Sequence, residues 1–402
     1  MNHPSKHKIL ILGGGYAGMM AAARLAREPR AEVTLIDARA TFTQRIRLHE
    51  MLAGGEPKTL DYASLLERRG VRFLQARVQR LEPGARRVFV RNPDEAIREL
   101  EYDTLILALG SATAPGVPGA AEHAIRLNDP IAIREAAVRL RALAASGGRA
   151  LVAGGGLTGI ETATELAERY PGLRVTLATR GRLGEDYSEA GSEHLRRVFA
   201  RLGVSLLEGA GIQSLEAGTA WMADGGAVPF DLCVWAGGFE APSLAREAGL
   251  PVDRSGRVIV DSALRAIGHS DILAAGDAAV AAFPDGRAIR MGCVSALPLG
   301  IHAGENVRRV LRGEEPRPFD FGILIRCISL GRKDGLVQFT ATDDAPRPKV
   351  WTRRLAVITK ELICRMTYEV VRNELRFGLP LYSWPGFGRP LVESHAATQR
   401  HG

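Results

Sequence analysis

The stretch that decides the fold is Lys8-Ile9-Leu10-Ile11-Leu12-Gly13-Gly14-Gly15-Tyr16-Ala17-Gly18. Its apolar run, 9–12, is typical of a buried parallel strand, and the Ala-rich residues 19–27 predict a helix. Between them the glycines form G-x-G-x-x-G. The first of these glycines makes a tight turn, the second lets the backbone approach a pyrophosphate, and the third lets the helix pack closely on the strand. The start of the helix offers free N–H groups and a positive dipole end to phosphates.

A carboxylate completes this unit. The next apolar segment, 33–36, predicts a second strand that ends at Asp37, where a carboxylate can accept hydrogen bonds from a ribose. A chain with 45 glycines produces such spacings by chance, so the glycine motif alone is weak. The strand, the helix and the acid together predict a dinucleotide-binding site.

The same pattern occurs a second time, in residues 150–159, and the apolar segment 173–177 follows it. Two such units in 402 residues predict two dinucleotides, most economically a flavin and a nicotinamide. We therefore expect an α/β fold with two Rossmann-like dinucleotide-binding domains, one for FAD and one for NAD(P)H, and a C-terminal α+β tail domain. The expected boundaries are 1–112 with 241–318 for a discontinuous FAD domain, 113–240 for the NAD(P)H domain and 319–402 for a C-terminal interface region.

The composition is that of an ordinary globular chain, with 46% hydrophobic and 24% charged residues. The polar start of the chain predicts no signal peptide, and no apolar stretch approaches the roughly 18 residues that span a bilayer, so we expect a cytoplasmic protein. The net charge of +8 permits an anionic partner or surface. Four cysteines, at 233, 293, 327 and 364, lie far apart without a C-x-x-C pair, so neither a disulfide framework nor a metal site is indicated.

Charged side chains follow the second strand. In a flavin domain the segment 42–54 lies beside the isoalloxazine ring, and disulfide reductases carry a redox cysteine pair there. This chain has no cysteine in that segment, so we do not expect dithiol chemistry. Arg45, Arg47 and His49 can meet the flavin, the nicotinamide or the substrate. The alternative is that they are solvated or ion-paired helix residues.

The second unit differs from the first in its acidic residues. Glu161, at the start of its helix, can hold the nicotinamide ribose or carboxamide, or can simply complement the helix dipole. Where the first unit ends its second strand with an acid, this one has Thr179, followed by Arg180. Loss of the ribose-binding acid and gain of arginine favour a 2′-phosphate, and so NADPH over NADH.

A further carboxylate returns the chain to the flavin. Gly276-Asp277 follows an apolar strand, and the carboxylate can bind the hydroxyls of a ribityl chain. Residues 298–309 predict a helix, and the segment from Val294 should aim its N–H groups at the N1/O2 edge of the ring. A helix dipole at that edge stabilises an anionic reduced flavin.

The tail from residue 319 has a different pattern. Residues 321–330 and 335–340 predict strands, and 351–377 predict a long helix. In this helix, interleaved with arginines and Lys360, apolar residues recur at a spacing close to 3.6; they are Leu355, Ile358, Leu362, Met366 and Val370. Such a basic amphipathic helix packs on its own domain or on a second subunit in a homodimer, or lies on an anionic membrane. The last alternative places the protein at the inner face of the cell membrane.

Five motifs, in this order over 8–309, resemble the two-dinucleotide-binding flavoproteins of the pyridine-nucleotide oxidoreductase superfamily, and most of all type II NADH dehydrogenases and related NAD(P)H:quinone reductases. The resemblance implies FAD held by Gly13, Gly15, Gly18, Asp37, Gly110 and Asp277, and NAD(P)H held by Gly154, Gly156, Gly159 and Glu161. Further cofactor contacts are expected at Gly14, Tyr16, Ala17, Ala38, Arg45, Val78, Ala108, Leu157, Thr158, Thr179, Arg180, Gly238, Gly276, Ser295 and Ala296.

One departure concerns the electron acceptor. The family carries a glutamine where this chain has Val294, and further glutamines where it has Pro298 and Leu299. We expect an FAD-dependent NAD(P)H oxidoreductase that passes hydride to the flavin and electrons to a quinone-type acceptor, with His49 and Glu50 as candidate proton donors. The alternatives are a ferredoxin or redoxin reductase and a flavoenzyme of specialised metabolism. Nucleic-acid binding is not expected, because the sequence has no aromatic-rich basic stripe.

Overall fold

The first glycine unit forms the centre of a five-stranded parallel sheet. In the computed structural model, which describes residues 6–283, 285–384 and 386–387, the strand order is β21-β9-β1-β2-β5. The strands are β1 (His7–Leu12), β2 (Ala31–Asp37), β5 (Arg72–Gln75), β9 (Thr104–Leu107) and β21 (Ile272–Ala274). α1 (Tyr16–Leu25) begins directly after the glycines and is buried along its whole length.

The second unit repeats this plan strand for strand. Its sheet has the order β11-β18-β12-β13-β14, again all parallel. The elements are β11 (Ala124–Arg126), α5 (Pro130–Ala145), β12 (Arg149–Ala153), α6 (Leu157–Arg169), β13 (Arg174–Ala178), α7 (Glu189–Leu202), β14 (Ser205–Leu207) and β18 (Leu232–Trp235). The predicted α/β class with two Rossmann-like units is confirmed.

The chain crosses between the units twice, and the crossings pair with each other. β10 (Ala112–Thr113) and β19 (Phe239–Glu240) form a two-stranded antiparallel link. These strands lie at the ends of the predicted NAD(P)H domain, and we retain the predicted division into domains as a proposal. The outermost residues of that division, 1–5 and 388–402, lie outside the described residues.

Shorter elements cover the edges of the two sheets. Two antiparallel meanders are β6 (Arg77–Glu82), β7 (Arg87–Arg91) and β8 (Ile97–Glu101), and β15 (Ile212–Glu216), β16 (Thr219–Met222) and β17 (Ala227–Pro229). Small pairs are β3 (Thr41–Thr43) with β4 (Thr59–Asp61) and β20 (Val258–Ile259) with β22 (Ala279–Val280). Short helices are α2 (Leu48–Met51), α3 (Tyr62–Leu66), α4 (Ala120–His123) and α8 (Leu244–Glu247).

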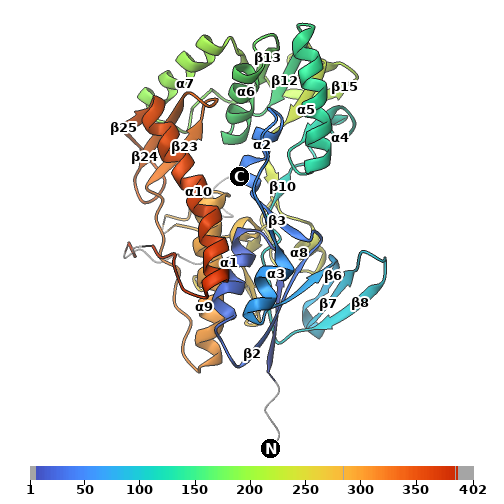
Figure 1. The fold of residues 1–402 in the computed structure, drawn as a ribbon, viewed down its shortest axis with the longest axis vertical. Coiled ribbons are helices and arrows are strands. Elements are labelled where there is room, and N and C mark those ends of the chain that lie inside the picture. The colour runs from blue at the N-terminus through green and yellow to red at the C-terminus, as the bar shows by residue number, and fades with distance from the viewer. Residues whose placement is uncertain (1–5, 284, 385, 388–402) are drawn as a thin grey trace, which may run out of the picture.

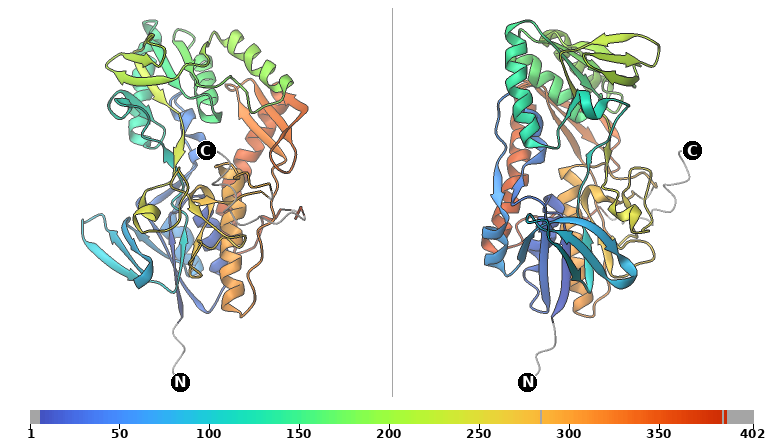
Figure 2. Two further views of the ribbon diagram at one scale, coloured as in Figure 1. Left: turned by 180° about the vertical axis from the view of Figure 1, so that it is seen from behind. Right: turned by 90° about the vertical axis from the view of Figure 1, so that its right-hand side faces the viewer.

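The C-terminal segment bridges both units. A three-stranded antiparallel sheet, β23 (Ile325–Ser329), β24 (Gly335–Thr340) and β25 (Pro346–Thr352), packs on α6 and α7. α10 (Arg353–Phe377) then runs alongside the molecule to contact α1 and α3 (Figure 1). The views in Figure 2 show the same arrangement from behind and from the side. The segment therefore fixes the two nucleotide-binding units relative to each other.

Two helix starts and one strand differ from prediction. β25 was not predicted, and Trp351, expected in the helix, lies in that strand, where its ring packs edge-on against Phe339 with centroids 4.9 Å apart. The strand contains prolines, which an edge strand tolerates because its outer N–H groups need no partner. α9 (Cys293–Leu311) begins five positions before the predicted start, so Pro298 lies inside it.

Four of the five residues of the apolar stripe predicted on α10 are exposed. Leu355, Ile358, Leu362 and Met366 are 51%, 57%, 61% and 41% exposed. The opposite face of the helix is buried instead, and Val370, the fifth predicted residue of the stripe, is partly buried against the core. Packing on its own domain therefore holds for Val370 but not for the other four residues of the stripe. Within the described ranges, no helix combines the length and apolarity needed to cross a membrane.

Candidate functional site

A cavity of about 1590 Å³ extends from the first glycine loop to the second. The N-termini of α1, α6 and α9 all meet it, and residues of β23 and α10 close its far side. α1 and α9 lie close together because Gly300 has no side chain: a Cβ at that position would stand 2.1 Å from the carbonyl oxygen of Ala17. The close crossing brings the two helix N-termini to one place, where their N–H groups can meet phosphate and ring oxygens.

The first loop has the geometry that a dinucleotide needs. Gly13 adopts φ +104°, and a Cβ there would lie 2.4 Å from the Ala108 carbonyl oxygen; at Gly18 it would lie 1.8 Å from the Gly13 carbonyl oxygen. At Gly15, by contrast, a Cβ would meet open space. The outer glycines thus serve chain packing, and the middle one leaves room for a pyrophosphate at the backbone. The Asp37 carboxylate accepts a hydrogen bond from the Gly14 N–H at 2.8 Å and holds this loop.

The second loop is built in the same way. Gly154 adopts φ +122°, and a Cβ there would lie 2.8 Å from the backbone of Ala236. At Gly159 a Cβ would lie 1.8 Å from the Gly154 carbonyl oxygen, whereas at Gly156 it would meet open space. Both loops therefore fit a dinucleotide.

Asp277 is hydrogen-bonded within the protein. Its carboxylate accepts hydrogen bonds from the Ser111 hydroxyl at 2.7 Å and from the Gly292 N–H at 2.8 Å. It thereby joins the segment between β9 and β10 to the start of α9, beside the expected ring position. Asp277 lines the cavity, and a carboxylate with two oxygens retains acceptor capacity for a ribityl hydroxyl.

Most of the predicted cofactor residues line the cavity. They are Gly14, Gly15, Tyr16, Ala17, Arg45, His49, Ala108, Gly110, Gly154, Gly156, Leu157, Thr158, Glu161, Thr179, Arg180, Gly238, Gly276, Asp277 and Ala296. Other predicted residues do not line it: Gly13, Gly18, Asp37, Ala38, Glu50, Val78, Gly159 and Ser295. Of these, the Ser295 hydroxyl donates to the Arg290 and Gly292 carbonyls and so holds the start of α9.

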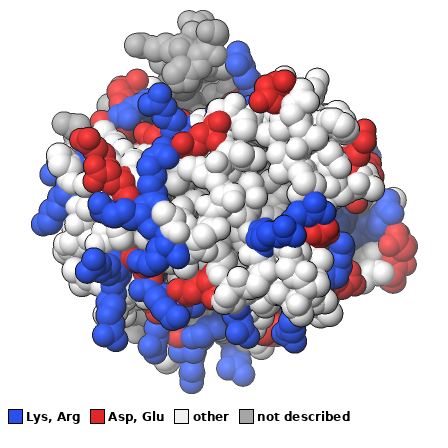
Figure 3. All heavy atoms as spheres, turned by 90° about the horizontal axis from the view of Figure 1, so that it is seen from above, with Lys and Arg blue, Asp and Glu red and all other residues white. Residues whose placement is uncertain are grey.

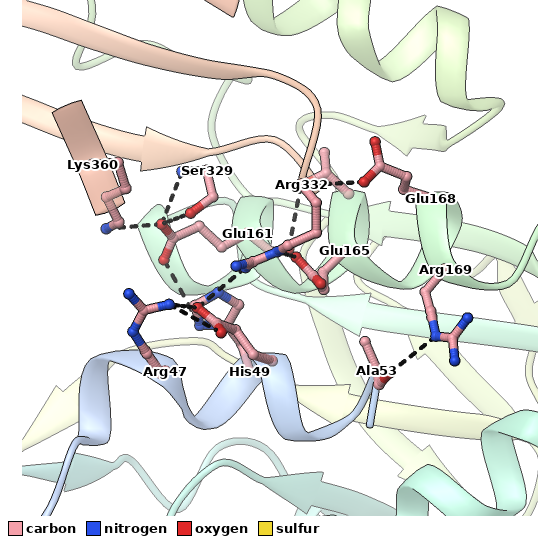
Figure 4. A network of polar contacts seen from close by, with 12 residues as sticks. Arg47, His49, Ala53, Glu161, Glu165, Glu168, Arg169, Ser329, Arg332 and Lys360 are labelled. Carbon is pink, nitrogen blue, oxygen red and sulfur yellow. Dashed lines mark hydrogen bonds and ion pairs between the residues drawn. The ribbon is translucent and has the colours of Figure 1, made fainter. Parts of the chain in front are cut away.

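A buried charge cluster lies where α2, α6 and the C-terminal segment meet (Figure 4). The Glu161 carboxylate lies 3.0 Å from Lys360 Nζ and accepts hydrogen bonds from the N–H and hydroxyl of Ser329 at 3.0 and 3.2 Å. His49 Nδ1 lies 4.0 Å from the same carboxylate. Lys360 Nζ also donates to the Cys327 carbonyl oxygen at 3.2 Å. An ammonium has three donors, so one remains for a ligand in the cavity that Lys360 lines.

The protonation states in this cluster follow from burial and pairing. Burial lowers the pKa of His49, which leaves the imidazole neutral near pH 7. Burial opposes ionisation of Glu161, but the Lys360 charge and the hydrogen bond from Ser329 lower its pKa. Burial likewise opposes the Lys360 charge, and Glu161 overcomes this and raises the pKa of the ammonium. Glu161 and Lys360 therefore form an ion pair beside a neutral imidazole.

Glu50 does not have the position expected of a proton donor. Its carboxylate is 3.0 Å from Arg47 and 3.1 Å from Arg332, and it does not line the cavity. Arg332, in the turn between β23 and β24, also pairs with Glu165 of α6 at 2.9 Å. The alternative of an ion-paired residue therefore describes Arg47, and Glu50, predicted as a proton donor, is instead the carboxylate that pairs with it and with Arg332.

Lys360 is a residue of the site that the sequence did not predict. It was expected among solvated charges of a basic helix, yet its side chain is only 18% exposed. Lys360, Cys364, Thr367 and Val371 recur at a spacing of three or four residues, which marks one helix face. That face is mixed in polarity, so the pattern gives no signal of burial unless the buried partners are known.

Three of the four cysteines converge on the cavity, although they come from different segments. Cys293, Cys327 and Cys364 all line it as free thiols. Burial raises the pKa of Cys327 to about 12 and that of Cys364 to about 11, and it also raises the pKa of Cys293. Protonated thiols are poor nucleophiles, so these side chains act as soft, weakly polar lining.

The second loop continues into exposed arginine. Thr179 is buried beside the loop, where a Cβ on Gly155 would lie 2.6 Å from its Cβ. Arg180 and Arg182 are exposed and line the cavity, and no ion pair of either side chain is found among the described residues. The Glu185 carboxylate is turned to the backbone N–H of Arg182 at 3.0 Å. Two guanidinium groups are thus available to a ligand phosphate.

Comparison with known proteins also indicates an oxidoreductase that binds a pyridine nucleotide. A model of the family described as pyridine nucleotide-disulphide oxidoreductase matches residues 7–297. The type II NADH:quinone oxidoreductase of Staphylococcus epidermidis is 28% identical over 388 residues, covering 82% of this chain and 89% of that protein.

Two solved structures share the fold over nearly the whole chain. The sulfide:quinone oxidoreductase of Aquifex aeolicus superposes with a TM-score of 0.78 at 18% identity, covering 96% of this chain and 99% of that one. The Plasmodium falciparum NDH2, solved with NADH, superposes with a TM-score of 0.77 at 14% identity, covering 94% of this chain and 100% of that one. At these identities the likeness bears on the fold alone.

Proposed function

Because the chain belongs to the pyridine nucleotide-disulphide oxidoreductase family, it is an FAD-dependent NAD(P)H oxidoreductase, and we propose that a quinone is its electron acceptor. The observation that carries the proposal is that one cavity joins both glycine loops to a far side on which apolar and sulfur-containing side chains lie beside the Lys360 ammonium. The acceptor class is supported by the curated relative that uses quinone and matches 82% of this chain. Ferredoxin or redoxin reduction and specialised metabolism remain the alternatives that the test below separates.

The protein supplies binding and orientation for this reaction. Bound FAD supplies the redox chemistry, since it takes a hydride from a nicotinamide and passes electrons to an acceptor. The open backbone at Gly15 and Gly156 would hold the two pyrophosphates at the N-termini of α1 and α6. The N-terminus of α9 lies beside Asp277 and would offer the positive end of its dipole to the ring of bound FAD.

The cluster of Lys360, Glu161 and His49 would stabilise negative charge and transfer a proton. Lys360 places a fixed positive charge and a free N–H at the cavity, where they stabilise negative charge that develops on a reacting oxygen. Glu161 holds the ammonium in place and keeps the net charge of the cluster near zero. His49 Nε2 is buried and has no hydrogen-bond partner among the described residues. We therefore retain His49 as the group that takes up and returns a proton, and we replace Glu50 by Lys360 as its neighbour in the site.

We also propose that the enzyme prefers NADPH. Thr179 provides no carboxylate that would repel a 2′-phosphate, and the exposed guanidinium groups of Arg180 and Arg182 can bind one. The Glu185 carboxylate, which also lines the cavity, accepts a hydrogen bond from the Arg182 N–H and so helps to hold this loop.

The exposed stripe of α10 supports a peripheral contact with the inner face of the cell membrane. Four large apolar side chains form the stripe, and exposed arginines of the same helix flank it, including Arg354 and Arg365. This combination suits an anionic lipid surface, which takes up apolar side chains and attracts the cations. A homodimer that buries the stripe is the competing outcome.

The surface gives no support to nucleic-acid binding on the face drawn in Figure 3. Basic and acidic side chains lie beside one another there, and they border a broad uncharged area. Nucleic-acid binding needs a continuous basic patch or stripe.

The test is stopped-flow absorption of the bound flavin, first with NADH or NADPH and then with a short-chain quinone. We expect rapid bleaching by a nicotinamide nucleotide and rapid recovery with the quinone. Rapid bleaching with slow recovery would exclude quinone and favour a protein or metabolite acceptor. Absence of bleaching with both nucleotides would contradict the oxidoreductase assignment itself.

A further inference from the structure

A second, smaller cavity lies at the C-terminal end of α9. Its volume is about 190 Å³, and it lies between the last turns of this helix and the segment that follows it. α9 ends at the lower edge of the molecule in Figure 1, opposite the second nucleotide-binding unit at the top. The lining of the cavity includes four arginines, which are Arg308, Arg309, Arg312 and Arg317. None of its lining residues belongs to the cavity that joins the two glycine loops.

The acidic side chains of this region neutralise only part of the positive charge. Three ion pairs are present: Arg309 with Glu314 at 2.7 Å, Arg312 with Glu28 at 3.1 Å, and Arg24 with Glu305 at 3.7 Å. Glu305 and Glu314, which line the cavity, are therefore both engaged with an arginine. Within residues 6–283, 285–384 and 386–387, neither Arg308 nor Arg317 has an ion pair, so two positive charges remain.

Arg308 has a buried N–H group without an acceptor. Its Nε is buried, and no hydrogen-bond partner for it is found among the described residues. Burial and the like charge of Arg312 lower the pKa of Arg308, although a guanidinium stays protonated in a protein. A buried donor without an acceptor costs free energy. An anion that enters the cavity would remove this cost.

The helix dipole explains only part of this arrangement. Arg308 and Arg309 lie in the last turn of α9, where positive charge is favourable. Arg317 lies outside the helix, and its backbone is held by Asn306 of α9, whose side chain accepts from the Arg317 N–H and donates to the Arg317 carbonyl, both at 2.9 Å. These bonds return the chain to the helix, so that Arg317 lines the same cavity as Arg308.

The charge and the size of the cavity favour a small dianion. Two unpaired guanidinium groups match a phosphate group, which carries a charge of about −1.5 to −2 near pH 7. The planar guanidinium fork also fits phosphate oxygens in pairs. The cavity volume lies below the roughly 300–1,000 Å³ of sites for drug-sized ligands. A phosphate ion or the phosphate end of a small monoester therefore fits better than a whole dinucleotide.

We propose that this cavity is a phosphate-binding site in which Arg308 and Arg317 bind the phosphate oxygens. The site is separate from both glycine loops, and it does not depend on the identity of the electron acceptor. A bound phosphate joins the last turn of α9 to the segment after it. Because it binds the native state, it also raises the free energy of unfolding as its concentration rises.

The experiment is calorimetric titration of the FAD-loaded full-length protein with inorganic phosphate and, separately, with glycerol phosphate. Excess NADP⁺ is present to occupy the second glycine loop. We expect a single saturable binding site. Tighter binding of the ion would identify free phosphate as the source of the ligand, and tighter binding of the ester would identify a phosphorylated metabolite; both outcomes support the site. Absence of saturable binding of either probe would overturn the proposal.

Two variants and a matched control test the residues. Arg308→Met and Arg317→Met each remove one guanidinium and keep an aliphatic side chain, and each should raise the Kd roughly 10- to 100-fold, as expected for a charged hydrogen bond. Arg317 is exposed, so its variant tests the site even if Arg308→Met is unstable. Arg98→Met makes the same change in net charge at an exposed position of β8 that does not line the cavity, and it should leave the Kd unchanged. An unchanged Kd in Arg317→Met, or an equal rise in Arg98→Met, would refute the assignment.

Discussion

Replacing Lys360 by Met should destabilise the protein in a way that depends on pH. Lys360 and Glu161 are 3.0 Å apart, with side chains 18% and 8% exposed. Without the ammonium, the Glu161 carboxylate stays in a largely buried position with only the two hydrogen bonds from Ser329. The substitution therefore leaves a buried charge without its counter-charge.

The size of the effect follows from this geometry. Breaking a buried ion pair by removing one partner costs about 3–5 kcal/mol. We expect the lower end, about 3 kcal/mol in the free energy of unfolding near pH 7, because Ser329 still satisfies one carboxylate oxygen and Lys360 is partly exposed to the cavity.

The pH dependence changes sign in the variant. In the wild type the pKa of Glu161 is lowered, so its contribution is present above the unfolded-state pKa and is lost as the pH falls. Without Lys360, burial raises this pKa above the unfolded-state value. The contribution is then complete at low pH and is lost as the pH rises through the folded-state pKa. The deficit of Lys360→Met should therefore be smaller at about pH 5 than at about pH 7.5.

The assay is urea unfolding of the holoenzyme at both pH values with the same excess of FAD, since a ligand that binds the native state shifts apparent stability. Lys8→Met is the control, because Lys8 pairs with Glu101 at 3.2 Å with side chains 51% and 70% exposed. That surface pair should contribute less than about 1 kcal/mol. A deficit for Lys360→Met that equals the control, or that does not change with pH, would refute the buried-pair reasoning.

Three further predictions concern the nucleotide, the surface and the core. Arg180→Ala should raise the KM for NADPH about tenfold, as expected for a charged hydrogen bond, and leave that for NADH nearly unchanged; equal changes in steady-state kinetics would contradict the assignment. The double variant Ile358→Ser and Leu362→Ser should lose sedimentation with anionic vesicles, whereas Val138→Ser, which alters a side chain 68% exposed on α5, should not; persistence of binding would favour another use of the stripe. Burial lowers the pKa of His302 to about 4. The contribution of His302 to the free energy of unfolding is therefore complete above the unfolded-state pKa of about 6.5, and it should fall by about 3 kcal/mol as the pH drops to about 4. Chemical unfolding of His302→Gln at a series of pH values should show a shallower fall.

Local features of the sequence were sufficient for both nucleotide-binding loops. The turn at Gly13, the approach at Gly15 and the packing at Gly18 depend on residues close in sequence or on the neighbouring strand of the same unit. Asp37 is the last residue of β2, and its position there brings the carboxylate to the Gly14 N–H. Such geometry repeats wherever strand, glycines and helix recur, and the second unit with Gly154 and Gly159 repeats it.

The C-terminal helix shows where sequence alone fails. Hydrophobic periodicity predicts burial of the apolar face on the premise that polar side chains prefer water. In α10 the polar side chains of the buried face find partners: Lys360 pairs with Glu161, and Glu374 pairs with Arg24 at 3.0 Å. These ion pairs offset the desolvation cost of burying that face, and the apolar stripe at Ile358 is left exposed.

The sequence by itself determined the α/β class, the two dinucleotide units and the loops that hold the cofactors, because these depend on short-range patterns of strand, glycine and helix. Only the tertiary structure decided which face of α10 is buried, that Lys360 meets Glu161, and that three cysteines from distant segments line one cavity. The physical reason is that these contacts join residues separated by 100 positions or more, as with Ser329 and Glu161, which are 168 apart. Such contacts follow from how the C-terminal segment packs across both units, and no local pattern specifies that.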